Sequence, residues 1–161
     1  MASILKTDKI EGVTASGTVQ MPAGHVVQVV NNRLSDNRYT TTSTSFTQLG
    51  SSLAITPKFS TSKILLLASA SFEMNGSHYA FFDFGKTTGG TTTQNLSGVG
   101  AGIISHYSGS WTNCFYSFQD APSTTNVVSY FSSVKVSGGT LYYNDSSAGT
   151  WSNFTLMEIA Q

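Results

Sequence analysis

The chain has 161 residues, of which only 10% are charged and 39% are hydrophobic, and its eight Lys and Arg balance its eight Asp and Glu. Soluble domains usually carry about a quarter charged residues, so hydroxyls, amides and exposed backbone must provide most of the contact with water here. Zero net charge excludes the basic surface that nucleic-acid-binding proteins and polybasic membrane-surface binders need. The length and the apolar content suffice for one folded domain.

Neither a membrane span nor a secretory signal is visible. The longest apolar run covers only residues 64–68, too short to cross a bilayer, and the first residues lack the apolar stretch of a signal peptide. Cys114 is the single cysteine, which rules out an intrachain disulfide framework. We therefore expect no membrane insertion, and stabilisation by burial and association.

The N-terminal residues differ in composition from the rest of the chain. Residues 1–24 have few bulky apolar side chains but contain Lys6, Asp8, Lys9 and Glu11. Such a stretch cannot bury enough surface to fold alone. We predict an extended segment over residues 1–24, closed by a turn, followed by a folded domain over residues 25–161.

From His25 onward the pattern is a succession of strands separated by Gly, Ser, Thr and Asn. No window has a helical period, so the fold is predicted to be all-β. A jelly-roll-like antiparallel sandwich is favoured, because the strand spacing suits two packed sheets and no fixed repeat indicates a propeller. The predicted strands are residues 25–30, 45–49, 53–59, 63–73, 78–85, 103–107, 114–119, 127–136, 141–143 and 154–160.

Three of these strands are apolar on both faces. In residues 63–73, Ile64 and Leu66 fall on one face and Leu65 and Leu67 on the other. Residues 78–85 and 127–136 repeat the pattern. Each such strand needs a second cover besides the facing sheet.

The sequence contains no recognisable catalytic or metal-binding arrangement. Its histidines, His25, His78 and His106, stand more than twenty residues apart, without the paired spacing of a zinc site. Cys114 lies in an apolar strand pattern and is expected to be a core residue. We therefore predict a non-enzymatic protein with no metal and no cofactor.

The carboxylates also lack a catalytic pairing motif. Asp83, between Phe82 and Phe84, is expected to face a turn or to pair with Lys86 or an arginine. The glycine-rich residues 98–102 precede a predicted strand, whereas phosphate-binding loops precede a helix, so they predict a tightly curved connection.

One group of aromatic and polar residues suits a sugar ligand, because sugar rings stack on aromatic faces while amides bind their hydroxyls. The alternative is that these aromatics belong to the core or to a subunit contact. The candidate ligand residues are Tyr107, Trp111, Tyr142, Tyr143, Asn144 and Trp151.

Six short stretches combine turns and strand starts: MPAGHVVQ (21–28), SFT (45–47), ITP (55–57), STSKIL (60–65), DAPSTT (120–125) and LMEI (156–159). They resemble small virion proteins of tailed bacteriophages, notably those of marine and cyanobacterial hosts, and the resemblance runs from about residue 3 to the end. It implies fibre, spike-tip or decoration modules that are commonly trimers, displayed on the virion surface after synthesis in the host cytoplasm.

The resemblance and the residues together lead us to expect a trimeric fibre or spike-tip module, joined to another virion protein through residues 1–24, where Lys6, Asp8, Lys9 and Glu11 lie. A capsid decoration or cement protein is the alternative within this class. A host-surface glycan is the further partner that a carbohydrate-binding tip would have. A glycan-degrading fibre is disfavoured, since no carboxylate motif supports it.

Overall fold

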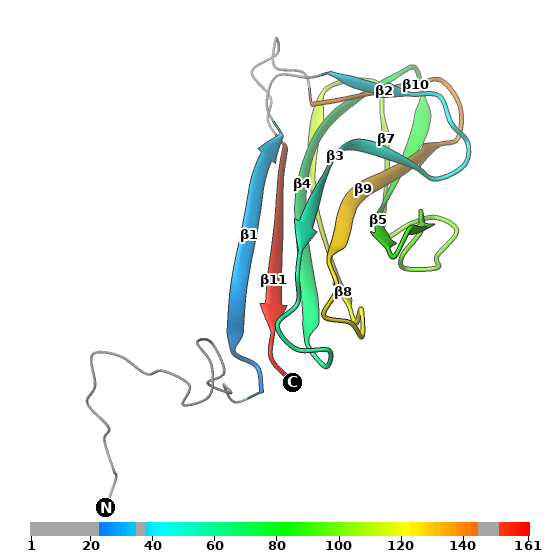
Figure 1. Ribbon diagram of the computed structural model, residues 1–161. Coiled ribbons are helices and arrows are strands. Elements are labelled where there is room, and N and C mark those ends of the chain that lie inside the picture. The colour runs from blue at the N-terminus through cyan, green and yellow to red at the C-terminus, as the bar shows by residue number, and fades with distance from the viewer. Residues whose placement is uncertain (1–22, 35–37, 145–151) are drawn as a thin grey trace, which may run out of the picture.

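The computed structural model describes residues 23–34, 38–144 and 152–161, and within these ranges the chain forms eleven strands and no helix (Figure 1). The all-β prediction is confirmed. The predicted anchor residues Lys6, Asp8, Lys9 and Glu11 and the candidate Trp151 lie outside the described residues. The strands are β1 (Val26–Leu34), β2 (Tyr39–Thr41), β3 (Thr47–Ile55), β4 (Lys63–Asn75), β5 (His78–Thr88), β6 (Thr91–Thr93), β7 (Ile104–Ser108), β8 (Thr112–Asp120), β9 (Val128–Val136), β10 (Thr140–Tyr143) and β11 (Ser152–Ile159).

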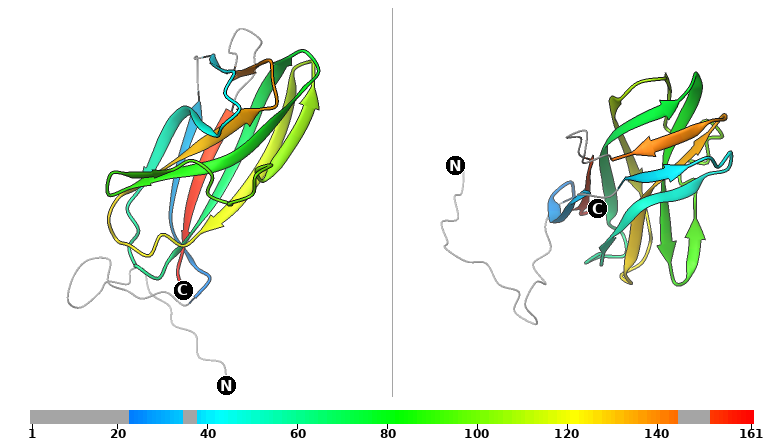
Figure 2. Two further views of the ribbon diagram at one scale, coloured as in Figure 1. Left: turned by 90° about the vertical axis from the view of Figure 1, so that its right-hand side faces the viewer. Right: turned by 90° about the horizontal axis from the view of Figure 1, so that it is seen from above.

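The strands form two antiparallel sheets. The β4 sheet contains β1, β11, β4 and β8 side by side, with β10 and β2 beside the far end of β4 (Figure 2, left). The β5 sheet contains β3, β9, β5 and β7, with β6 beside the last residues of β5. If only the eight longest strands are numbered in chain order, one sheet has the strand order 1-8-3-6 (β1, β11, β4, β8). The other sheet has the order 2-7-4-5 (β3, β9, β5, β7). This is the order of a jelly roll.

The core lies between the two sheets and is built by alternation along each strand. In β4, Ile64 and Leu66 are fully buried while Leu65 and Leu67 are half-buried on the other side. In β5, Phe82 points into the core. The predicted alternation between the two faces of the three doubly apolar strands is therefore confirmed. Phe72, Phe84, Tyr116 and Phe154 join Phe82 in a chain of ring contacts with centroid separations of 4.7–5.7 Å.

A fully buried carboxylate holds the connection between β3 and β4. Glu158 Oε1 accepts hydrogen bonds from the backbone N–H groups of Lys58 at 2.7 Å and Phe59 at 3.3 Å. Its Oε2 accepts one from Gln28 Nε2 at 2.5 Å. Buried carboxylates need such partners, so the role of Glu158 is to hold the connection between β3 and β4 in place.

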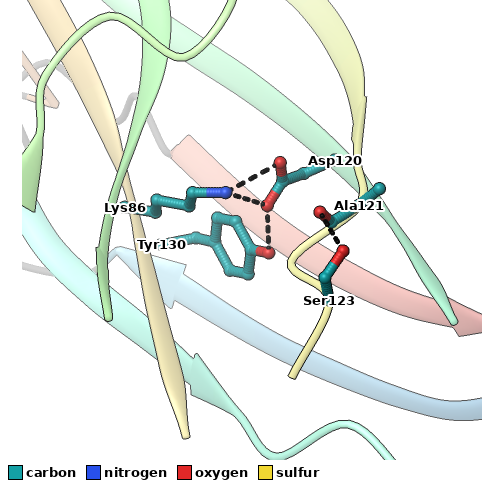
Figure 3. A network of polar contacts seen from close by, with 5 residues as sticks. All are labelled: Lys86, Asp120, Ala121, Ser123 and Tyr130. Carbon is teal, nitrogen blue, oxygen red and sulfur yellow. Dashed lines mark hydrogen bonds and ion pairs between the residues drawn. The ribbon is translucent and has the colours of Figure 1, made fainter. Parts of the chain in front are cut away.

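A second polar contact joins the two sheets at one end of the sandwich (Figure 3). Lys86 of β5 donates to both carboxylate oxygens of Asp120 of β8, at 2.9 and 2.8 Å, and the Tyr130 hydroxyl of β9 donates to Asp120 Oδ2 at 2.7 Å. Burial, and then the bond to Asp120, raise the pKa of Tyr130 well above its usual value, so this hydroxyl remains a donor.

The outer side of the β5 sheet is covered in part by the chain itself. Asp83 and Phe131 point away from the core, yet both are buried, because residues 93–103 close over them. Asp83 accepts hydrogen bonds from its neighbour Phe84 N–H at 2.6 Å, from Ser97 N–H at 3.3 Å and from the Ser97 hydroxyl. Of the alternatives expected for Asp83, pairing with Lys86 is wrong, since Lys86 binds Asp120, and Asp83 instead faces the connection that contains Ser97.

The glycine-rich residues within this cover form a tight connection, as predicted. Gly98 and Gly102 have φ of 72° and 69°, and a Cβ on Gly102 would lie 2.4 Å from the Phe82 carbonyl oxygen. The backbone can therefore approach β5 closely enough for Ile103 N–H to bond the Phe82 carbonyl at 2.8 Å. The strand β7 follows directly, which leaves no helix for an anion site.

Candidate interaction surfaces

The outer side of the β4 sheet carries apolar side chains beside polar ones such as Thr155, Ser117 and Gln119, and we call the apolar ones together the apolar face. Its middle row is made by direct cross-strand neighbours: Val29 of β1 opposes Met157 of β11, which opposes Leu65 of β4. Val29 is 54% exposed and Phe115 of β8, at the edge of the face, is 63% exposed. The apolar face consists of Val26, Val29, Leu65, Leu67, Phe115, Met157 and Ile159.

Charged side chains avoid the middle of the apolar face. On the outer side of β4 they occur only at the strand ends, as Lys63 and Glu73. Among the described residues, nothing covers Leu65 and Leu67 from outside in the way that residues 93–103 cover the β5 sheet. Contiguous exposed apolar patches of this kind mark sites of interaction with other macromolecules.

The outer side of the β5 sheet carries a different surface, which we call the aromatic patch. Tyr79 and Tyr107 are cross-strand neighbours with ring centroids 4.9 Å apart, and Tyr79 also stacks on Phe81 at 6.0 Å. The ammonium group of Lys135 lies 5.2 Å from the Phe81 ring centre and 5.0 Å from that of Phe46. Tyr79 and Tyr107 are 48% and 54% exposed, so their rings are accessible.

Of the predicted ligand residues that the structure describes, only Tyr107 lies in this patch. Tyr142 lies on the outer side of the β4 sheet, opposite Glu73, with the Arg38 guanidinium 4.0 Å above its ring. Trp111 is half-buried in the connection between β7 and β8. The predicted ligand group is therefore dispersed over both sheets.

Two other members of that group are structural, which corrects the prediction. Tyr143 is fully buried in the core, where burial raises the pKa of its hydroxyl. Asn144, with φ of 57°, donates from its backbone to the Ser71 carbonyl and accepts from the Ser152 N–H through Oδ1, each at 2.9 Å. Asn is one of the few residues that tolerates this left-handed conformation.

The sequence reasoning missed Tyr79 and Phe81 as surface residues. Both alternate with the core residues Ala80 and Phe82, so the period-two pattern did assign them to the opposite face of the strand. What the pattern could not show is that residues 93–103 cover Asp83 on that side but leave Tyr79 exposed.

Burial raises the pKa of two titratable groups on β8, Cys114 and Tyr116. Burial raises the pKa of Cys114 to about 12, which keeps it a thiol at neutral pH and a poor nucleophile. The Tyr116 hydroxyl, whose pKa is also raised by burial, donates to Ser132 Oγ at 2.8 Å. Within the described ranges, no three His, Cys, Asp or Glu side chains gather as a metal ion would require.

Comparison with protein-family models finds no match to this sequence, and no curated protein matches it either. The described part of the chain also contains no helix long and apolar enough to cross a membrane.

Proposed function

We propose that this chain is a non-enzymatic structural subunit of a tailed-phage particle, which associates into a trimer through the apolar face and projects from the virion surface as a fibre or spike-tip module. The apolar face is the observation that carries the proposal. The phage assignment is supported by the sequence resemblance described above. A capsid decoration protein is the alternative within the same class, since a trimer on the shell would use the same contact.

The size of the apolar face accords with self-association. Three residues of the face, Val26, Val29 and Phe115, are about half exposed, and covering each of them contributes about 1 kcal/mol. The other four are half-buried and contribute less, so the face contributes roughly 3–6 kcal/mol per subunit. The loss of translational and rotational freedom on association costs about 4–15 kcal/mol. Burial of the apolar face therefore offsets part of this cost, and further contacts between subunits must supply the rest. A rotationally symmetric trimer closes the surface without leaving an unpaired patch. The near absence of charge on the face removes repulsion between copies.

The trimer is tested by measuring the mass of the wild-type chain in solution by sedimentation. We expect three times the 17.1 kDa chain mass at micromolar concentration. The double variant Leu65→Glu, Met157→Glu should be a folded monomer, because it places carboxylates in the centre of the apolar face, where a subunit contact would bury them unpaired. Val99→Glu is the matched control, since Val99 is 51% exposed but lies in the glycine-rich connection. A monomeric wild type overturns the proposal, and imaging of labelled virions distinguishes tail from shell.

The aromatic patch favours a second candidate function, recognition of a host-surface glycan. Two accessible tyrosine rings 4.9 Å apart offer an apolar platform, and Lys135 and the tyrosine hydroxyls supply polar contacts at its border. Jelly rolls occur in both viral and lectin domains, which is an analogy at the level of the fold only. This function is compatible with a trimer, because the two surfaces belong to different sheets.

Binding to an array of bacterial surface glycans tests this second candidate. Each aromatic contact contributes about 0.5–1.5 kcal/mol, so Tyr79→Ala with Tyr107→Ala should weaken binding about tenfold. Tyr142→Ala, on the other sheet, is the control and should leave binding unchanged. Wild-type protein that binds no glycan on the array, or a double variant that binds as well as wild type, excludes a glycan site at this patch.

A further inference from the structure

The strand β8 is an edge of the β4 sheet without the usual protection of an edge. It pairs with β4 on one side, and no strand of the described residues pairs with it on the other. Its residues Thr112–Asp120 include no Pro, Gly or Lys, and its single charge, on Asp120, is bound by Lys86. Proteins normally protect such an edge with charges, bulges or a covering segment, because its unpaired backbone groups attract further strands.

The other long edge strands, β1 and β3, are better protected, and the remaining edge strands, β2, β6 and β7, have only three to five residues. The opposite edge of the β4 sheet, β1, has a register shift between Val26 and Gln28 and carries Arg33. The strand β3, at the edge of the β5 sheet, has a register shift between Leu49 and Leu53. An irregular edge disfavours the addition of a strand. The edge of β8 is therefore the preferred site for strand addition.

The core is also incompletely closed beside β8. Cys114 and Phe118 point inward and pack against the core, yet both remain half-buried. On the outer side of the same strand Phe115 is 63% exposed. A strand added here would cover apolar surface on its inner side in addition to satisfying the backbone of β8.

The chain contains a segment with the sequence of such a strand. In residues 13–21, Val13, Ala15, Val19 and Met21 occupy alternate positions, with Gly17 between them. The intervening residues are Thr14, Ser16, Thr18 and Gln20. This strict alternation is typical of a strand that has one buried and one solvated side, and its nine positions equal the nine residues of β8.

The chain between residue 21 and β1 is too short for residues 13–21 to reach β8 of the same copy, so the β8 to which they add must belong to another copy. Gly24 is held beside β11 by a hydrogen bond from its N–H to the Ala160 carbonyl at 2.8 Å. A strand beyond β8 would lie four strand spacings from β1, about 19 Å away. The three residue steps from Gly24 back to Met21 span at most about 11 Å. Residues 13–21 therefore cannot align along the β8 of their own chain.

We infer that residues 13–21 of one copy add as a strand to the free edge of β8 of the next copy. The inference depends on the trimer proposed above and names a contact that supports its apolar face. The apolar side chains of the segment would cover Cys114 and Phe118, and the polar ones would continue the outer face beside Ser117. Because each copy gives a strand to its neighbour, the contact runs head to tail and closes after three subunits.

Disulfide trapping in the full-length chain tests the inference. In a background carrying Cys114→Ser and Ser117→Cys, a second cysteine is introduced by Thr14→Cys, Ser16→Cys or Thr18→Cys, or by the matched controls Ala15→Cys and Gly17→Cys. A disulfide needs Cα atoms about 4.4–6.8 Å apart and side chains on one face. We expect crosslinks between chains from the polar series, strongest at one position, and several-fold fewer from the controls.

The outcomes separate this inference from the proposed function. A trimer that gives no crosslinks, crosslinks both series equally, or crosslinks only within one chain overturns the strand addition and leaves the trimer standing. A monomeric wild type overturns both. Period-two crosslinking between chains, with the mass of a trimer, supports the inference.

Discussion

At the scale of single residues, the tightest constraint is the contact between Gly85 and Phe131. The two are cross-strand partners in β5 and β9, and the Phe131 ring lies over Gly85 on the outer side of the sheet. A Cβ on Gly85 would lie 2.1 Å from the ring, and Phe131 is only 1% exposed, so the ring has little room to move. Gly85→Ala should therefore reduce the free energy of unfolding by about 1–3 kcal/mol.

Urea denaturation of this variant measures the change directly. Gly100→Ala is the matched control, because no atom lies within 4 Å of a Cβ at that position. We expect the control to unfold at the wild-type urea midpoint or slightly above it. If Gly85→Ala is as stable as Gly100→Ala, the ring does not occupy the position described.

The sequence could predict the direction of a side chain more readily than its exposure. Alternation placed Ile64 and Leu66 on one face and Leu65 and Leu67 on the other, and the structure agrees, with the first pair in the core. Tyr143 was assigned to a ligand group because it follows Tyr142 beside Asn144, yet it is fully buried. Exposure depends on what packs over a residue from elsewhere in the chain, which a local pattern does not contain.

At the scale of elements, long strands were predictable and short polar ones were not. The strands β2 (Tyr39–Thr41) and β6 (Thr91–Thr93) have three residues each, too few to show alternation. The strand β3 was predicted as two, because the polar residues around Gly50 resemble a turn. In the structure the strand continues through this point, and a register shift accommodates it. Tertiary pairing thus overrides the local turn signal.

The need for a second cover was also predictable, but its source was not. The sequence reasoning expected neighbouring subunits to cover the second apolar faces, whereas residues 93–103 of the same chain cover Asp83 and Phe131. Only the β4 sheet keeps an uncovered apolar face. Likewise, the bond between Lys86 and Asp120 joins two residues that are 34 positions apart in the sequence. Both features depend on which distant parts of the chain the jelly-roll fold brings together. The local sequence of a single strand does not contain this information.

At the scale of the whole molecule, low charge and an apolar face together determine how assembly should respond to solution conditions. Charged residues are 10% of the chain and the net charge is zero, so neither repulsion nor attraction between copies is strong. Hydrophobic association is insensitive to screening, but it weakens on cooling and strengthens with sulfate. The N-terminal charges Lys6, Asp8, Lys9 and Glu11 form the exception, because they are concentrated within six positions.

We therefore predict that NaCl weakens attachment to particles but leaves trimer formation nearly unchanged. Raising NaCl from about 0.05 M to about 0.5 M shortens the screening length to about 4 Å, yet should change the dissociation constant of the trimer by less than about threefold. Cooling to about 4 °C should weaken the trimer, and ammonium sulfate should strengthen it. Attachment through residues 6–11 should weaken with NaCl, measured as protein released from particles. A trimer that dissociates in NaCl while attachment persists would show that charges, and not the apolar face, hold the subunits together.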